Sequence, residues 1–201
     1  LNNGQICWLN TRVLAPRSRY TEIVDTITGL ASALTIGDPL DPETKIGPLV
    51  SSRQRERVEG YIAKGKQEGR LTTGGSRPSS QDRGWFVEPT VFADVDNNAV
   101  ISREEIFGPV LSVIPYADES EAIAIANDSN YGLGGSVWSS DTERAAGVAR
   151  KVRSGTVGVN HYVNEPVAPF GGIKESGMGR ELGPEGLDAF QVYKTIYLPP
   201  A

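Results

Sequence analysis

Cysteine, histidine and methionine each occur at most once in this 201-residue sequence. With Cys7 as its only thiol the chain cannot form an internal disulfide, so we expect a reducing, cytoplasmic setting. One cysteine and the sole histidine, His161, do not make a zinc ligand set, so no metal centre is expected. No segment approaches the length of about eighteen apolar residues that a membrane span needs. The 25 acidic residues outnumber the 20 basic ones, which disfavours a nucleic-acid partner.

Helical patterns recur along the chain. Apolar residues over 20–34 repeat with the period of one helix face. Ser51 followed three residues later by Gln54 is a capping-box pattern, and it predicts the start of a second helix. The same pattern predicts two further helices, one beginning at Asp118 and one at Ser140.

Between the helices lie β-rich runs, and the segment 161–183 is expected to be an ordered loop because it has no apolar period. Alternation of strands with helices of this length indicates an α/β fold with a mostly parallel sheet covered by helices on both faces, in three layers. One domain is the expectation for this length. The predicted strands are 13–15, 70–73, 86–92, 110–116, 134–138, 155–160 and 191–198.

Three segments that each contain glycine or proline stand between these elements, where α/β proteins carry their functional groups. The first runs from Asn2 to Cys7, with the thiol at its end. The second is Glu104-Glu105-Ile106-Phe107-Gly108-Pro109. The third runs from Pro169 to Gly183 and contains Pro-Phe-Gly-Gly-Ile-Lys-Glu-Ser-Gly.

Together these segments resemble the aldehyde dehydrogenase superfamily from one end of the chain to the other. The resemblance implies that Cys7 is the catalytic nucleophile, which adds to an aldehyde carbonyl and supplies its own backbone N–H to the oxyanion. It also implies that the thiohemiacetal loses hydride to a nicotinamide and that the thioacyl enzyme is then hydrolysed. Trp8, directly after the thiol, and Phe170 would line the substrate pocket.

The resemblance implies a cofactor site as well, for NAD or NADP. Glu105 would accept hydrogen bonds from the nicotinamide ribose hydroxyls, with Phe107 beside the ring. Gln54 matches a family position near the same ribose, although a helix cap explains this residue equally well.

In the family, the general base, a second oxyanion donor and the cofactor-binding domain lie upstream of the cysteine. The sequence begins at Leu1, within the motif, so we expect an excised catalytic domain over 1–201 that lacks the upstream domain and is nearly inactive alone. Its segment from about 180 to 201 would serve oligomerisation, with 191–198 as the strand that pairs in a homodimer or homotetramer.

Other functions remain open at this point. Cys7 and His161 could form a cofactor-independent thiol hydrolase, or the chain could be a non-catalytic assembly domain. Within the enzyme hypothesis, a thioacyl intermediate could pass to CoA instead of water. The run from Gly177 to Gly183 does not fit a dinucleotide fingerprint, because its third glycine is one place late and a loop precedes it.

Overall fold

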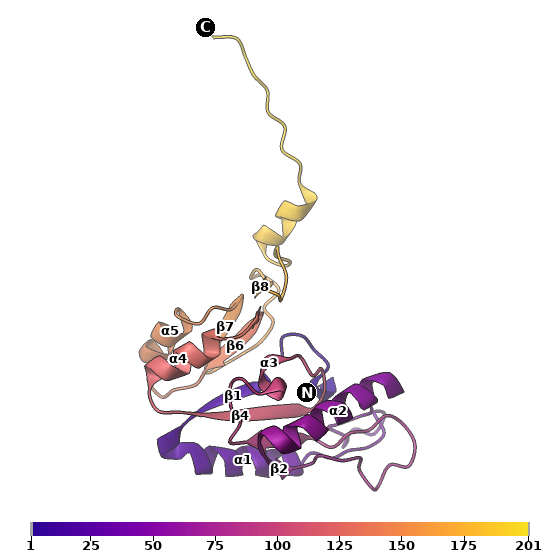
Figure 1. The fold of residues 1–201 in the computed structure, drawn as a ribbon. Helices are drawn as coiled ribbons and strands as arrows, with labels where there is room; N and C mark the ends of the chain where they lie inside the picture. The colour runs from indigo at the N-terminus through magenta and orange to yellow at the C-terminus, as the bar shows by residue number, and fades with distance from the viewer. Residues whose placement is uncertain (1, 201) are drawn as a thin grey trace. The chain divides into compact units, whose positions relative to one another are not determined.

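The computed structural model describes residues 2–200, which form two compact units that meet in sequence between Ser129 and Asn130. The first unit contains a four-stranded sheet of β1 (Arg12–Pro16), β2 (Arg70–Thr73), β3 (Thr90–Ala93) and β4 (Val110–Tyr116) in the order β1-β4-β3-β2 (Figure 1). The pairs β1–β4 and β3–β4 are parallel, and β2 joins one edge antiparallel to β3. The sheet is therefore mostly parallel, as predicted.

Four α-helices belong to this unit: α1 (Tyr20–Ser32), α2 (Ser52–Glu68), α3 (Val100–Arg103) and α4 (Glu119–Asn127). Short 3-10 turns lie at Asn2–Gly4 and Arg17–Arg19. None of the helices in the described part of the chain is both long and apolar enough to cross a membrane.

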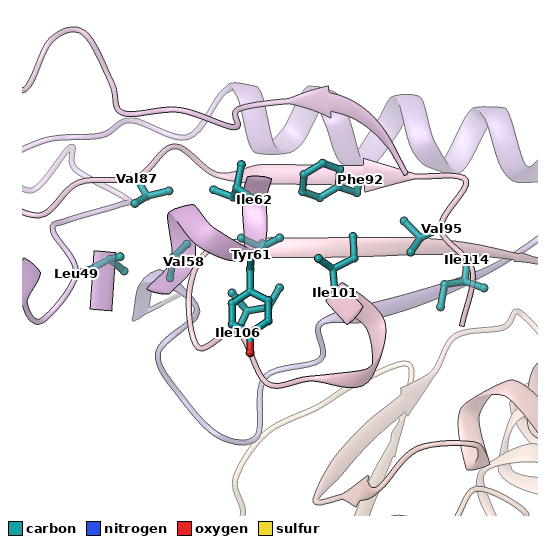
Figure 2. Packing of buried hydrophobic residues seen from close by; sticks show 11 residues of the cluster. Leu49, Val58, Tyr61, Ile62, Val87, Phe92, Val95, Ile101, Ile106 and Ile114 are labelled. Carbon is teal, nitrogen blue, oxygen red and sulfur yellow. The ribbon is translucent and has the colours of Figure 1, made fainter. Parts of the chain in front are cut away.

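Side chains of β3 and β4 alternate between two apolar clusters, because successive residues of a strand face opposite sides of a sheet. On one side α1 contributes Val24 to a cluster that also contains Ala15, Val91, Ala93 and Val113. On the other side α2 and α3 cover a larger cluster, shown in Figure 2. This second cluster contains Leu49, Val58, Tyr61, Ile62, Val87, Phe92, Val95, Ile101, Ile106, Val110 and Ile114. Helices thus cover both faces, which confirms the three-layer α/β class.

The second unit contains a parallel pair of strands, β6 (Gly134–Val137) and β7 (Thr156–Val159), with α5 (Thr142–Ala149) between them in sequence and packed on both. A shorter antiparallel pair joins β5 (Tyr131–Gly132) to β8 (Ile173–Lys174). A 3-10 helix, η3, follows at Pro184–Phe190.

Two of the predicted helix starts are confirmed and one is wrong by a residue. The Ser51 side chain accepts from the Gln54 N–H of α2, and Asp118 accepts from the Glu121 N–H of α4. The third helix, α5, is capped by Asp141 and not by Ser140. Aspartate and serine are comparable caps, so the local pattern did not distinguish neighbouring candidates.

Two strand predictions and one loop prediction also need correction. Only Thr90–Ala93 of the apolar run beginning at residue 86 is a strand. The segment 161–183, predicted to be a loop, contains β8. Residues 191–200, which include the predicted strand 191–198, form no strand and are exposed. A strand requires a hydrogen-bonded neighbouring strand, and among residues 2–200 the only backbone hydrogen bond of this segment is the one from the Gln191 N–H to the Asp188 carbonyl.

Candidate functional site

The Cys7 segment (residues 2–7) and the Glu105 turn (residues 104–109) come together at the amino-terminal edge of the large sheet. The first leads into β1 and the second into β4, and these strands are parallel neighbours with Arg12 opposite Ser112. The Ser112 N–H also donates to the Thr11 carbonyl at 3.0 Å, which extends the pairing toward the strand starts. Parallel neighbours begin at the same edge, so the two segments are brought together although they lie far apart in sequence.

Two side-chain amides fasten the Cys7 segment to the loop before α2. Asn3 donates to the Pro48 carbonyl at 2.9 Å and accepts from the Gly47 N–H at 3.0 Å. Gln5 accepts from the Val50 N–H at 3.1 Å. The segment is therefore held to residues 47–50 by hydrogen bonds from its side chains to the backbone of that loop.

A glycine pair joins the Cys7 segment to the Glu105 turn. Gly4 has a left-handed φ of 73°, and a Cβ at this position would collide with the carbonyl of Gly108. Gly108 in turn lies against Val58 of α2, where a Cβ would also collide. Only glycine satisfies both the backbone conformation and the close approach at Gly4, so the spacing between thiol and turn is set by main-chain contact.

The Cys7 thiol is exposed at the end of this anchored segment. Within residues 2–200, Cys7 has no hydrogen bond to any other residue, so neither its sulfur nor its backbone N–H has a protein partner. Trp8 follows it and is half-buried. An accessible sulfur beside a backbone N–H is the arrangement that attack on a carbonyl and stabilisation of the resulting oxyanion require.

The two carboxylates of the Glu105 turn differ in their surroundings. Glu104 accepts a hydrogen bond from the Tyr61 hydroxyl at 2.6 Å. The Glu105 carboxylate is exposed and makes no hydrogen bond or ion pair with any other residue of 2–200. An exposed carboxylate offers two acceptor oxygens to a pair of hydroxyls. Glu105 could therefore accept from a ribose diol, whereas Glu104 already accepts from Tyr61.

Side chains of α2 hold the backbone of this turn. The Gln54 amide donates to the carbonyls of Ile106 and Phe107, at 3.2 and 2.8 Å, while the Arg57 guanidinium donates to the Glu105 carbonyl. Gln54 therefore lies beside the predicted cofactor residues. Its predicted contact with the ribose stays a prediction, and the helix-cap alternative accounts only for its backbone N–H.

The remaining predicted residues, Phe170 and His161, belong to the second unit. Phe170 is half-buried and forms an antiparallel bridge with Glu181, with N–H to carbonyl distances of 2.7 and 2.8 Å. The Arg180 guanidinium donates to the Gly172 carbonyl at 2.9 Å. The run 169–183 is therefore folded onto itself by its own backbone. His161 is exposed just after β7.

Sequence reasoning missed Asn3, Arg57 and Tyr61 as parts of the site. Their partners are backbone groups or side chains more than forty positions away, at a separation of 45 for Asn3 with Pro48 and 48 for Arg57 with Glu105. No periodic pattern marks such contacts. The one available signal was the position of Arg57 and Tyr61 on the Gln54 face of a predicted helix.

Within residues 2–200, an exposed thiol and an exposed carboxylate without a protein partner thus lie on neighbouring turns at one edge of the α/β sheet. The comparisons with known proteins define the family. The model of the aldehyde dehydrogenase family matches residues 1–196, and the chain belongs to this family.

Individual relatives agree. The chain is 59% identical to the geranial dehydrogenase of Castellaniella defragrans over 198 residues, which cover 98% of this chain and 41% of that protein. A crystal structure of Mycobacterium tuberculosis aldehyde dehydrogenase complexed with NAD+ superposes with a TM-score of 0.95 at 56% identity, covering 98% of this chain and 41% of that one. A cysteine-to-alanine mutant of Pseudomonas syringae aldehyde dehydrogenase C, complexed with NAD+ and octanal, gives 0.90 at 41% identity, covering 92% and 39%. The chain thus spans about two fifths of the length of these relatives.

Proposed function

We propose that this chain is the catalytic portion of an NAD- or NADP-dependent aldehyde dehydrogenase, with Cys7 as nucleophile. The observation that carries the proposal is the direct packing of the Cys7 segment on the Glu105 turn through Gly4 and Gly108. It sets a free thiol and a free carboxylate on one main-chain framework. Family membership and relatives crystallised with NAD+ support the same conclusion.

In the proposed reaction the Cys7 sulfur, as thiolate, adds to the aldehyde carbon. The carbonyl oxygen gains the negative charge and accepts a hydrogen bond from the Cys7 N–H. A bound nicotinamide would supply the hydride acceptor that converts the tetrahedral adduct to a thioester. Water then attacks the thioester and releases the carboxylate, which frees the thiol.

Glu105 and Phe107 would hold the cofactor. The Glu105 carboxylate, free of protein partners, would accept from the two ribose hydroxyls, and Phe107, the half-buried aromatic residue two positions on, would pack beside the ring. By the family resemblance, Trp8 of the first unit and Phe170 of the second are each proposed to contact the aldehyde. The complex of the Pseudomonas syringae relative with octanal supports an apolar aldehyde as the first substrate to test.

The test is aldehyde-dependent reduction of NAD, followed by absorbance, in a protein that joins this chain to the upstream cofactor-binding domain that the family resemblance implies. Cys7→Ser should lower kcat by at least about a thousandfold, and Glu105→Gln should raise the KM for NAD with little change in the KM for the aldehyde. Normal turnover by the serine variant would refute the nucleophile. Ester hydrolysis without NAD that disappears in His161→Ala would favour the thiol-hydrolase alternative.

We further propose that residues 1–201 alone turn over aldehydes very slowly. The general base and second oxyanion donor that the family resemblance implies have no counterpart assigned in this chain. Strong Cys7-dependent NADH production by the 201-residue chain would contradict this.

Oligomerisation is the role that we propose for the segment from about 180 to 201, in a homodimer or homotetramer. Residues 191–200 are exposed, and Val192, Tyr193, Ile196, Tyr197 and Leu198 present apolar surface without cover. Pairing with a neighbouring subunit would give the segment the hydrogen-bond partners that it lacks in one chain. Removal of residues 191–201 should then yield monomers in sedimentation velocity, and an unchanged oligomer would contradict the proposal.

A further inference from the structure

Helix α2 carries three polar side chains on one face that all reach the Glu105 turn. Gln54, Arg57 and Tyr61 are spaced i, i+3 and i+7, which places them on the same stripe of the helix. We refer to these three residues as the bracket.

The bracket contacts four consecutive residues of the turn. Tyr61 donates to the side chain of Glu104, Arg57 to the Glu105 carbonyl, and Gln54 to the carbonyls of the next two residues. In the middle of this series stands Glu105, whose own carboxylate is left free. The bracket therefore holds the Glu104 side chain before the proposed cofactor residue, and the carbonyls of Glu105 and the next two residues, without using the Glu105 side chain.

The turn has a conformational reason to need such support. Phe107 has a φ of 60°. The left-handed region is unfavourable for a non-glycine residue, and it persists where surrounding contacts over-determine it. Gln54 donates to the carbonyls of Ile106 and Phe107, which lie on either side of the bond that the Phe107 φ angle describes. Release of these bonds would allow the turn to relax and would redirect both Glu105 and Phe107.

One member of the bracket is anchored in the core. Tyr61 is 8% exposed and belongs to the large apolar cluster together with Val58 and Ile106 (Figure 2). The Arg57 guanidinium lies over the Tyr61 ring, 5.0 Å from its centroid, where the cation is attracted to the ring face. Since the helix, the ring and the guanidinium support one another, the donors of the bracket are held in place before any ligand binds.

We propose that Gln54 and Arg57 are positioning residues, which hold the Glu105 turn in the conformation that presents Glu105 to the nicotinamide ribose. The expected effect on cofactor binding rests on the proposed function, but the contact between the bracket and the turn can be tested without that proposal. Both residues act on the backbone of the turn, so their removal should change the backbone exchange of the turn itself. Removal of a direct ligand to the cofactor would not have this effect.

The first experiment measures hydrogen–deuterium exchange of the peptide covering 104–110 in the 201-residue chain. Gln54→Leu and Arg57→Met should each accelerate its exchange about two- to tenfold, the factor that corresponds to loss of a typical hydrogen bond. Arg57→Lys keeps a donor and should restore most of the protection. Arg53→Met is the matched control, because Arg53 is an exposed arginine on the same helix and its side chain makes no hydrogen bond or ion pair within residues 2–200. Unchanged exchange in both test variants would overturn the proposal.

The second experiment uses the active protein described for the proposed function. Gln54→Leu/Arg57→Met should raise the KM for NAD at least about threefold, because only the population with an ordered turn binds well. The KM for the aldehyde should stay within a factor of two, roughly the scatter of such measurements. Faster exchange with an unchanged KM for NAD would show that the bracket is merely structural and would overturn the positioning role.

Glu105→Gln separates failure of the inference from failure of the proposed function. It removes charge from the proposed ligand but leaves the backbone carbonyls intact, so exchange of 104–110 should not change. If the variant has a normal KM for NAD, Glu105 is not the cofactor residue and the positioning role falls with it, while the exchange result still decides whether the bracket holds the turn.

Discussion

Two glycines of α2 differ only in what lies beside them, and the difference predicts opposite effects of the same substitution. An alanine Cβ at Gly60 would meet no atom within 4 Å, whereas at Gly65 it would lie 2.7 Å from the ring of Phe92. Phe92 is fully buried at 0% exposure. Its ring, shown in Figure 2, therefore has no solvent-filled space into which it could move.

Both substitutions share one favourable term. Alanine is about 1 kcal/mol better than glycine in a helix interior, so Gly60→Ala should stabilise the first unit by up to about 1 kcal/mol. Gly65→Ala gains the same term, but overpacking costs about 1–3 kcal/mol. The free energies of unfolding of the two variants should thus differ by about 1–3 kcal/mol, with Gly65→Ala the less stable.

Urea denaturation followed by tryptophan fluorescence measures this difference. The Trp138→Phe background removes the fluorophore of the second unit and leaves Trp8 and Trp85 to report on the first. Equal stability of Gly60→Ala and Gly65→Ala would refute the reasoning. As a further check, Phe92→Leu should cost less in the Gly65→Ala background than alone, because the smaller side chain relieves the contact.

Two more outcomes follow from particular contacts. In urea denaturation of the chain that retains Trp138, so that both units report, Gly4→Ala should destabilise the first unit by about 1–3 kcal/mol more than Gly179→Ala destabilises the second. Both glycines have a positive φ, but only Gly4 abuts the Gly108 carbonyl. Arg103 lowers the pKa of Asp128 through a hydrogen bond to its carboxylate. A lowered pKa stabilises the folded state at pH values above the usual aspartate pKa of about 3.9, and this contribution is lost as the pH falls through the lowered pKa. The difference in free energy of unfolding between wild type and Arg103→Gln should therefore narrow over this pH range. A gap that stays constant from pH 7 to about pH 2 would contradict this.

The regular elements of the fold were largely predictable because local patterns determine them. The capping serine of α2 and the capping aspartate of α4 were found from spacing alone, and the apolar period located α1. The strand 191–198 was predicted from the alternation of apolar and polar residues, but alternation shows only that a segment is compatible with a sheet. Whether it becomes a strand depends on a neighbour that the local sequence does not specify.

The candidate site was predictable in its reactive residues and not in its supports. Cys7 and Glu105 stood out because short turns carry them, and the resemblance assigned their roles. Which glutamate of the pair is free could not be predicted, since Tyr61 takes Glu104 from a separate helix. The anchoring by Asn3 was hidden for the same reason, because its partners are backbone atoms of a distant loop.

The anchoring of the Cys7 segment has a consequence for how the protein folds. Asn3 reaches the Gly47–Pro48 backbone across 44 and 45 positions, and Gly4 rests on Gly108 beyond the whole of α1, α2 and β3. Closure of such long loops costs chain entropy that no local contact offsets. We therefore expect the thiol to reach its native setting only after the sheet and α2 have formed, so that a partly folded chain does not yet hold the nucleophile against its turn.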